Sequence, residues 1–179
     1  MTIPESLPSG FSTPEGRPIR ILFVCLGNIC RSPAAEEVFR TVVEEHHCSS
    51  GFEIDSAGMG RYHIGSLPDQ RMRVHARRRG LDLTHRCRCV TDDDFDNFDL
   101  IIGMDSMNIS DLRDMAPTVE SQHKIVPMAS FFGSFSHYDH VPDPYYQGSE
   151  GFELVLDLLQ DACVNLFDTL SHNSGHPAS

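Results

Sequence analysis

The sequence predicts a single α/β domain in which a doubly wound, four-stranded parallel sheet is flanked by helices. Two observations lead to this fold class. Short apolar runs alternate with longer segments of helical periodicity, and a loop of small and polar residues joins the first run to the first helix. The expected strands span residues 19–24, 52–55, 98–103 and 124–127, and the expected helices lie near 32–45, 68–79, 106–115 and 149–170. With 179 residues, 40% of them hydrophobic, the chain can bury one substantial core.

The first strand and the first helix carry the clearest local signals. Residues 19–24 are mostly branched and aromatic, as in a buried strand of a parallel sheet. We expect Ser32 to cap the following helix and Pro33 to be its first residue. An apolar face then repeats at helical spacing, formed by Ala35, Val38, Phe39, Val42 and Val43.

The last helix and the two ends complete the predicted organisation. The last helix carries an apolar stripe that we expect to cover the sheet rather than bind a partner. Residues 1–18 are rich in Pro, Ser and Gly, and residues 171–179 are short and polar. We therefore expect a disordered N-terminal extension and a polar tail around a domain of residues 19–170.

The loop between the first strand and the first helix is the most informative stretch for chemistry. This cysteine loop (residues 25–31) begins with Cys25 and ends with Arg31. Its peptide N–H groups can surround an anion if the backbone visits left-handed conformations, which Gly27 and Asn28 tolerate best. Arg31 adds a planar fork for two oxygens, and the helix N-terminus and this cation favour a thiolate at Cys25. The predicted phosphate-binding residues are Leu26, Gly27, Asn28, Ile29, Cys30 and Arg31.

Two other interpretations of this loop are less favoured. Cys25 could merely end a strand and Arg31 could be a surface charge, but the residue types all fit a strand–loop–helix anion site. A nucleotide-binding P-loop would require a Gly-Lys-Ser/Thr sequence, and the loop contains no lysine.

Residues 25–33, together with Asp143-Pro144-Tyr145-Tyr146, resemble the low-molecular-weight protein tyrosine phosphatase family. The resemblance runs from about Arg20 to Leu170 and includes Asp55-Ser56-Ala57-Gly58, Thr84-His85 and Met104-Asp105 in the family's order and spacing. It implies hydrolysis of phosphotyrosine in proteins through a phosphocysteine intermediate, with no metal and no cofactor. A silent phosphotyrosine-binding module is disfavoured because Cys25, Arg31 and Asp143 are all present.

Asp143 also has a physical rationale as the third predicted catalytic residue, beside Cys25 and Arg31. Once the thiolate attacks phosphorus, the departing phenolate needs a proton that a positioned carboxylic acid can supply. Pro144 disfavours a helix at Asp143, which suits a carboxyl group reaching into a cleft from an extended loop. The resemblance implies that Asp143 then activates water against the phosphocysteine. An ordinary Asp-Pro turn is the alternative.

The resemblance also implies supporting residues. Ser32 matches the hydroxyl that stabilises the thiolate, and Ser56 and His85 match polar groups that brace Asn28 and the loop. For each there is a simpler alternative: a helix cap for Ser32, a turn residue for Ser56 and a surface histidine for His85. The segment Arg86-Cys87-Arg88-Cys89 departs from the usual family sequence after His85.

The expected substrate-wall residues are three tyrosines, Tyr62, Tyr145 and Tyr146, which match family positions at the mouth of the cleft. Phosphotyrosine extends deeper than phosphoserine and needs apolar surface on both ring faces. The family's protein-arginine phosphatases carry threonine where Ile29 stands and lack the tyrosine pair. These differences favour phosphotyrosine, although the tyrosines could also be packing residues.

The six cysteines favour neither a disulfide scaffold nor a zinc site, since no secretory signal is visible and the spacings do not match usual zinc motifs. Cys30 lies in the same tight loop as Cys25, so it is the expected redox partner that protects the nucleophile. Arsenate reduction, a second function on this fold, needs two further cysteines spaced six residues apart. Cys87 and Cys89 are separated by only one residue.

Charge and hydropathy restrict the partners. A net charge of −12 opposes nonspecific binding to nucleic acid, and no apolar run is long enough for membrane insertion. Seven arginines between residues 71 and 88 could recruit acidic phosphoproteins, but a solvated helix face balanced by the aspartates of residues 92–96 is favoured. We expect a cytoplasmic monomer or weak dimer whose partner is a tyrosine-phosphorylated protein.

Overall fold

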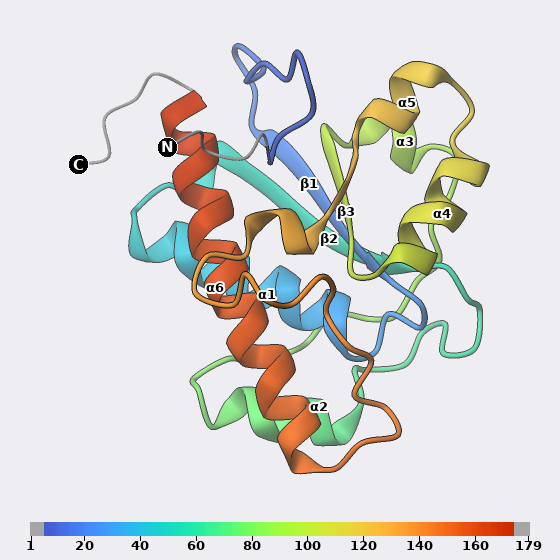
Figure 1. Ribbon diagram of the computed structural model, residues 1–179, viewed down its shortest axis with the longest axis vertical. Helices are drawn as coiled ribbons and strands as arrows, with labels where there is room; N and C mark the ends of the chain where they lie inside the picture. Colours follow the sequence, from blue (N-terminus) through green and yellow to red (C-terminus); the bar gives the residue numbers. More distant parts are fainter. Residues whose placement is uncertain (1–5, 174–179) are drawn as a thin grey trace.

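The computed structural model describes residues 6–173, which contain one parallel sheet with strand order β2-β1-β3-β4 (Figure 1). The strands are β1 (Ile19–Cys25), β2 (Phe52–Gly58), β3 (Leu100–Gly103) and β4 (Ile125–Pro127). All three neighbouring pairs are parallel. The predicted doubly wound fold is therefore confirmed, and β1 lies in its interior between β2 and β3.

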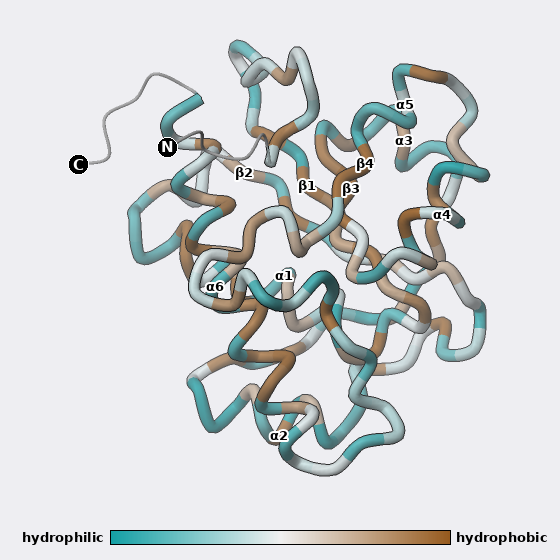
Figure 2. Tube along the Cα trace, in the orientation of Figure 1, coloured by the Kyte–Doolittle hydropathy of each residue, from teal (hydrophilic) through white to brown (hydrophobic). Residues whose placement is uncertain are grey.

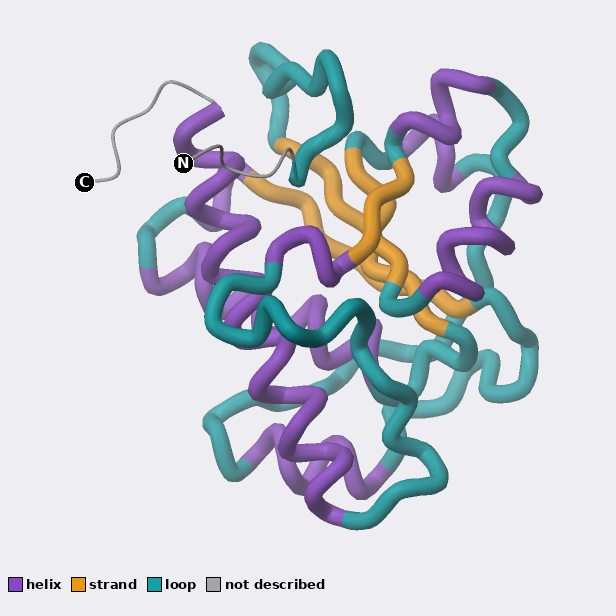
Figure 3. Tube along the Cα trace, in the orientation of Figure 1, coloured by secondary structure: helices purple, strands orange, loops and turns teal. Residues whose placement is uncertain are grey.

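Helices cover both faces of the sheet, as Figure 3 shows by the strands lying between helical layers. The helices are α1 (Arg31–Glu45), α2 (Gln70–Arg77), α3 (Asp94–Asn97), α4 (Ser106–Met115), α5 (Val119–His123) and α6 (Ser149–Asn173), with 3-10 turns at Ser49–Gly51 and Met128–Phe131. Helices α1, α2 and α6 pack on one side, and α3 and α4 pack on the other. No helix among residues 6–173 is long and apolar enough to cross a membrane.

The alternation of β1 explains why its sequence is apolar almost throughout. Ile21 and Phe23 belong to the core cluster under α1 and α6, whereas Leu22 and Val24 belong to the cluster under α3 and α4. All four side chains are fully buried, so each face of the strand contributes to a core. Figure 2 shows the same pattern as a hydrophobic centre around the sheet. The buried strand ends at Cys25 and so fixes the position of the cysteine loop.

The start of α1 differs from the prediction. The helix begins at Arg31, Cys30 occupies the cap position without a side-chain hydrogen bond, and Pro33 is the third helical residue. Ser32 is therefore not the N-cap. Its hydroxyl instead contacts the thiol of Cys25 and the side chain of Asn28, both within the cysteine loop.

The two ends also differ from the expectation of disorder over residues 1–18 and of a tail from residue 171. In the N-terminal segment (residues 6–18), Leu7 and Phe11 pack against the main core, and Arg17 pairs with Asp99 at 2.7 Å. Apolar burial and this ion pair give the segment a defined path. Helix α6 continues to Asn173, while residues 1–5 and 174–179 lie outside the described residues.

Candidate active site

The cysteine loop is held by hydrogen bonds to the outward side of its backbone. Met59 N–H donates to the carbonyl of Cys25, Gly60 N–H to that of Leu26, and Asp69 N–H to that of Ile29, at 2.8–3.0 Å. The C=O and N–H of one planar trans peptide point in opposite directions, so the following N–H groups point toward the inside of the loop. Among the described residues, the backbone N–H groups of residues 27–30 have no partner within the protein. The loop therefore presents a ring of available donors.

Two positions show how closely the loop fits the sheet edge. A Cβ added to Gly58, at the end of β2, would lie 2.8 Å from the carbonyl oxygen of Leu26 and 3.0 Å from the nitrogen of Asn28. Only glycine fits there without a backbone shift. Asn28 has the left-handed φ of 55° that the sequence predicts, whereas Gly27 does not have a positive φ, so the prediction is wrong for Gly27.

The side chain of Asn28 is fully buried and makes four hydrogen bonds. Its Nδ2 donates to the hydroxyls of Ser32 and Ser56 at 2.8 and 3.0 Å. Its Oδ1 accepts from the ring Nε2 of His85 at 2.9 Å and from the backbone N–H of Arg88 at 3.0 Å. The structure thus brings together the predicted supporting residues around one loop side chain.

The other ring nitrogen of His85 faces two carboxylates. Its Nδ1 lies 3.2 Å from Glu36 Oε1 and 3.5 Å from Asp55 Oδ1, so the ring lies between Asn28 and two acidic side chains. Glu36, Asp55 and His85 also form the group among the described residues whose ligand atoms, all within 4.8 Å of one another, could hold a metal ion. Arg40 and Arg88 already pair with the two carboxylates, so both acidic groups have cationic partners within the chain.

Arg31 reaches the site from the first turn of α1 and is 3% exposed. Its NH1 donates to Asp105 Oδ2 at 2.7 Å and to the carbonyl of Val141 at 3.0 Å, while its NH2 lies 3.7 Å from Asp143 Oδ2. Burial alone would lower the pKa of Arg31, but Cys25 and the two aspartates raise it above its ordinary value. Arg31 is therefore a fixed cation.

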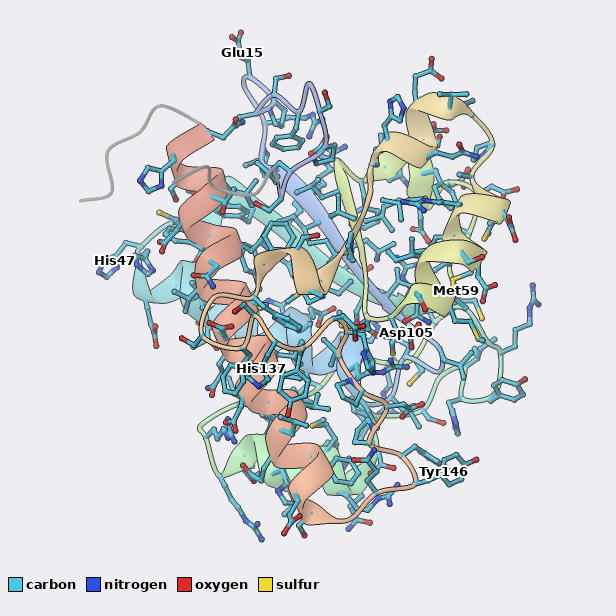
Figure 4. The ribbon with its side chains drawn as sticks, in the orientation of Figure 1. Glu15, His47, Met59, Asp105, His137 and Tyr146 are labelled. Carbon is cyan, nitrogen blue, oxygen red and sulfur yellow. The ribbon has the colours of Figure 1, made fainter. Side chains whose placement is uncertain are left out.

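Asp105 lies directly beside Arg31, a role that sequence reasoning missed. Asp105 follows β3 and caps α4, where its Oδ1 accepts from the N–H of Asn108 at 2.8 Å. Figure 4 shows it where α4 begins, near the carboxyl ends of the strands. Two features of the sequence could have indicated Asp105 as a site residue. It follows a predicted strand, where polar residues commonly form sites, and it belongs to the Met104-Asp105 pair.

A cavity of about 450 Å³ opens above the cysteine loop. Cys25 and Arg31 line its base, and Asp143, which is 45% exposed, lies at its side. The backbone N–H of Tyr145 donates to Asp143 Oδ1 at 3.0 Å. The three predicted catalytic residues thus share one cavity.

The mouth of this cavity is aromatic. All three predicted wall tyrosines line it: Tyr62 and Tyr146 are 79% and 93% exposed, and Tyr145 is partly covered. Figure 4 shows Tyr146 on the loop that precedes α6. His63, which sequence reasoning missed, also lines the mouth, with its ring centroid 6.5 Å from that of Tyr145. Its position beside Tyr62 was the only sequence signal.

The six cysteines are free thiols. Cys30 is buried, and burial, followed by Asp69 and Cys25, raises the pKa of its thiol far above the ordinary value. Cys87 lies behind the loop, where its Sγ contacts the carbonyl of Asn28 at 2.8 Å and burial raises its pKa to about 11. Cys87 is therefore a buried thiol packed against the cysteine loop.

The predicted arginine cluster is largely paired within the chain. Arg79 contacts Glu153 and Asp157, Arg88 contacts Asp55 and Asp94, and Arg71 contacts Asp69. Within the expected balancing segment of residues 92–96, Asp94 makes such a pair. Arg77 also lies 3.9 Å from Asp82, so four of the seven arginines form ion pairs within the domain.

Residues 20–175 match the family described as low molecular weight phosphotyrosine protein phosphatase. The chain belongs to this family. The family member of Schizosaccharomyces pombe is 42% identical over 86% of this chain and 97% of its own length. The predicted family and enzyme class are confirmed.

Solved structures of family members agree with the fold. A protein tyrosine phosphatase from Entamoeba histolytica, with Hepes in its active site, has 44% identity and a TM-score of 0.83 over 86% of this chain and 97% of its own. YfkJ from Bacillus subtilis has 38% identity and a TM-score of 0.81 over 89% of this chain and 98% of its own.

Proposed function

We propose that this family member hydrolyses phosphotyrosine in proteins through a phosphocysteine intermediate and needs no metal ion. The observation that carries the proposal is the convergence of Cys25, the available N–H groups of the cysteine loop, Arg31 and Asp143 on one cavity. The loop and Arg31 supply the positive electrostatic field that a metal ion supplies in other phosphatases.

In the first step, the thiolate of Cys25 attacks phosphorus and the bond to the phenolic oxygen breaks. The Sγ of Cys25 lies 3.0 Å from the Ser32 hydroxyl, and when Cys25 is a thiolate only that hydroxyl can donate in the contact. The inward N–H groups and Arg31 hold the three non-bridging oxygens, whose charge distribution changes in the transition state.

Asp105 and Val141 hold one end of the Arg31 guanidinium. Its NH2 remains directed toward Asp143 and the cavity, where it can pair with a phosphoryl oxygen. Asp105 is thus a positioning residue that presents Arg31 to the substrate.

Asp143 transfers the protons in both steps. As an acid it protonates the departing phenolate, and as a base it then takes a proton from the water that hydrolyses the phosphocysteine and restores the Cys25 thiolate. The hydrogen bond from the Tyr145 N–H to Oδ1 leaves Oδ2 for this transfer. A half-exposed carboxyl group at the side of the cavity has access to both the leaving group and water.

The aromatic mouth supports phosphotyrosine as the substrate. Tyr62, Tyr145 and Tyr146 offer apolar surface to a phenyl ring whose phosphate lies at the base of the cavity. A phosphoserine side chain is shorter and has no ring to contact these walls.

The proposal extends to redox protection and location. Under peroxide, Cys25 is oxidised to a sulfenic acid, and attack by the Cys30 sulfur forms a disulfide with loss of water. Both thiols belong to the same buried loop, and thiol catalysis together with six free cysteines supports the reducing cytoplasm as its location.

The test is phosphate release from a phosphotyrosine peptide in chelator and reductant. Matched phosphoserine and phosphoarginine peptides and the Cys25→Ser variant serve as comparisons. We expect turnover of the phosphotyrosine peptide alone and its loss in Cys25→Ser. Folded wild-type protein without turnover, or turnover that stops in chelator, refutes the proposal.

A further inference from the structure

The start of α2 lies between the cysteine loop and the segment that carries Asp143. We propose that Arg71 is a positioning residue that holds the acid loop (residues 141–148) so that Asp143 can reach the leaving group. This inference rests on the proposed function. From the sequence, Arg71 was expected to belong to a solvated helix face with no role in the site.

Arg71 is anchored to the cysteine loop through Asp69. Asp69 caps α2, and its backbone N–H donates to the carbonyl of Ile29 in the cysteine loop at 2.8 Å. The Asp69 carboxylate accepts from the Arg71 backbone N–H at 2.8 Å and from its guanidinium Nε and NH2 at 3.1 and 2.9 Å. The guanidinium is thus fixed relative to the cysteine loop, although half of the side chain is exposed.

Two aromatic rings lie close to the Arg71 guanidinium. Its Cζ lies 4.9 Å from the ring centroid of Phe152, which is buried in α6, and 5.3 Å from that of Tyr145, which belongs to the acid loop. Cations attract aromatic rings within about 6 Å. Arg71 therefore joins a buried ring of the core to a partly exposed ring of the loop.

Tyr145 is connected directly to the carboxyl group of Asp143. The Tyr145 backbone N–H donates to Asp143 Oδ1, so a movement of Tyr145 also moves the carboxyl group. Within residues 6–173, the other rings near Tyr145 belong to His63 and Tyr146, both at the mouth of the cavity. Arg71 thus links Tyr145 to the core ring of Phe152.

Direct substrate binding by Arg71 is the competing role. Asp69 already occupies the Nε/NH2 edge of the guanidinium, one of its two bidentate edges, and the rings of Phe152 and Tyr145 lie within cation–π distance of its Cζ. The geometry therefore favours positioning over binding, and the two roles differ in their kinetics.

The test uses aryl phosphates whose leaving groups differ in basicity, because a poor leaving group depends more on the acid. We expect Arg71→Met to lower kcat/KM for phenyl phosphate by about tenfold, which is a part of the ~100-fold or more that a general acid contributes. For p-nitrophenyl phosphate, whose leaving group depends less on the acid, we expect kcat/KM to fall by less than about twofold. Arg71→Lys should show the same dependence with a smaller loss, since it keeps the charge and loses the planar face. Arg78→Met, an exposed arginine at the C-cap of the same helix, should match wild type.

A double variant separates positioning from a structural or binding role. In an Asp143→Asn background, Arg71→Met should cause no further loss, because the group through which it acts is already absent. Equal losses for both aryl phosphates, or an additive loss in that background, would overturn the inference. Wild-type protein without Cys25-dependent turnover would instead refute the proposed function, and thermal melting of each variant identifies a general folding defect.

Discussion

Replacement of Asn28 by alanine tests the central physical claim about the loop. Asn28→Ala removes four buried hydrogen bonds and leaves two hydroxyls, a histidine ring and a backbone N–H without their partner. At about 0.5–1.5 kcal/mol per bond the loss is about 2–6 kcal/mol, and we expect about 3 kcal/mol of unfolding free energy. In a domain of this size that lowers Tm by about 6–12 °C.

The backbone adds a second, separable contribution. Asn28 has a φ of 55°, which glycine adopts freely and alanine does not. We therefore expect Asn28→Gly to be more stable than Asn28→Ala by about 1 kcal/mol, even though both lack the four bonds.

Urea denaturation with the phosphotyrosine assay measures both effects. We expect kcat/KM to fall by at least about tenfold in both variants, because the donors that face the phosphate depend on this brace. Asn173→Ala, which loses one exposed contact to Thr13, should stay within about 0.5 kcal/mol of wild type. Wild-type stability and turnover in Asn28→Ala would refute the reasoning.

Three further predictions concern other parts of the domain. Asp105→Asn should lower kcat/KM by about tenfold or more with little change in KM, because Arg31 loses the charge that orients it, and steady-state kinetics measure this. Gly58→Ala should cost about 1–3 kcal/mol in thermal unfolding, since its Cβ would lie 2.8 Å from a loop carbonyl. Burial would raise the pKa of Asp99, but Arg17 and backbone contacts hold it below its ordinary value. Its contribution to stability is therefore present above the unfolded pKa and lost as pH falls through the folded pKa. The protection factors of the N-terminal segment, which compare its amide exchange rates with those of an unfolded chain at the same pH, should therefore fall in acid and in Asp99→Asn.

The sheet and the cysteine loop could be predicted because their signals are local. The run that became β1 is apolar on both faces, and the loop that follows has the residue types of an anion site within seven positions. Helices α3 and α5 were missed because segments of four and five residues are too short to show a helical period. The sequence could not separate a helix cap from a thiol contact at Ser32, because both roles require the same side-chain hydroxyl.

Contacts between distant residues were harder to predict than elements. Arg31 and Asp105 are 74 residues apart and meet only because β1 and β3 are neighbours in the sheet. The N-terminal segment looked disordered by composition, but Leu7 and Phe11 are covered by a core surface that the sequence does not reveal. The resemblance to the family implied that His85 supports the loop. The two carboxylates beside its Nδ1 could be identified only from the folded structure.

The arrangement of the loop explains why its donors can act without reorganisation. Its carbonyls are held from outside by N–H groups of three residues that follow β2 or precede α2, and its one left-handed residue is held by side chains from α1, β2 and the segment around His85. None of these contacts uses the inner face of the loop. The N–H groups are therefore aligned during folding. In the proposed function an incoming phosphate would find donors already oriented, which is the condition under which such groups lower a barrier most. Weakening an outer contact should then reduce the rate even though that contact never touches the substrate.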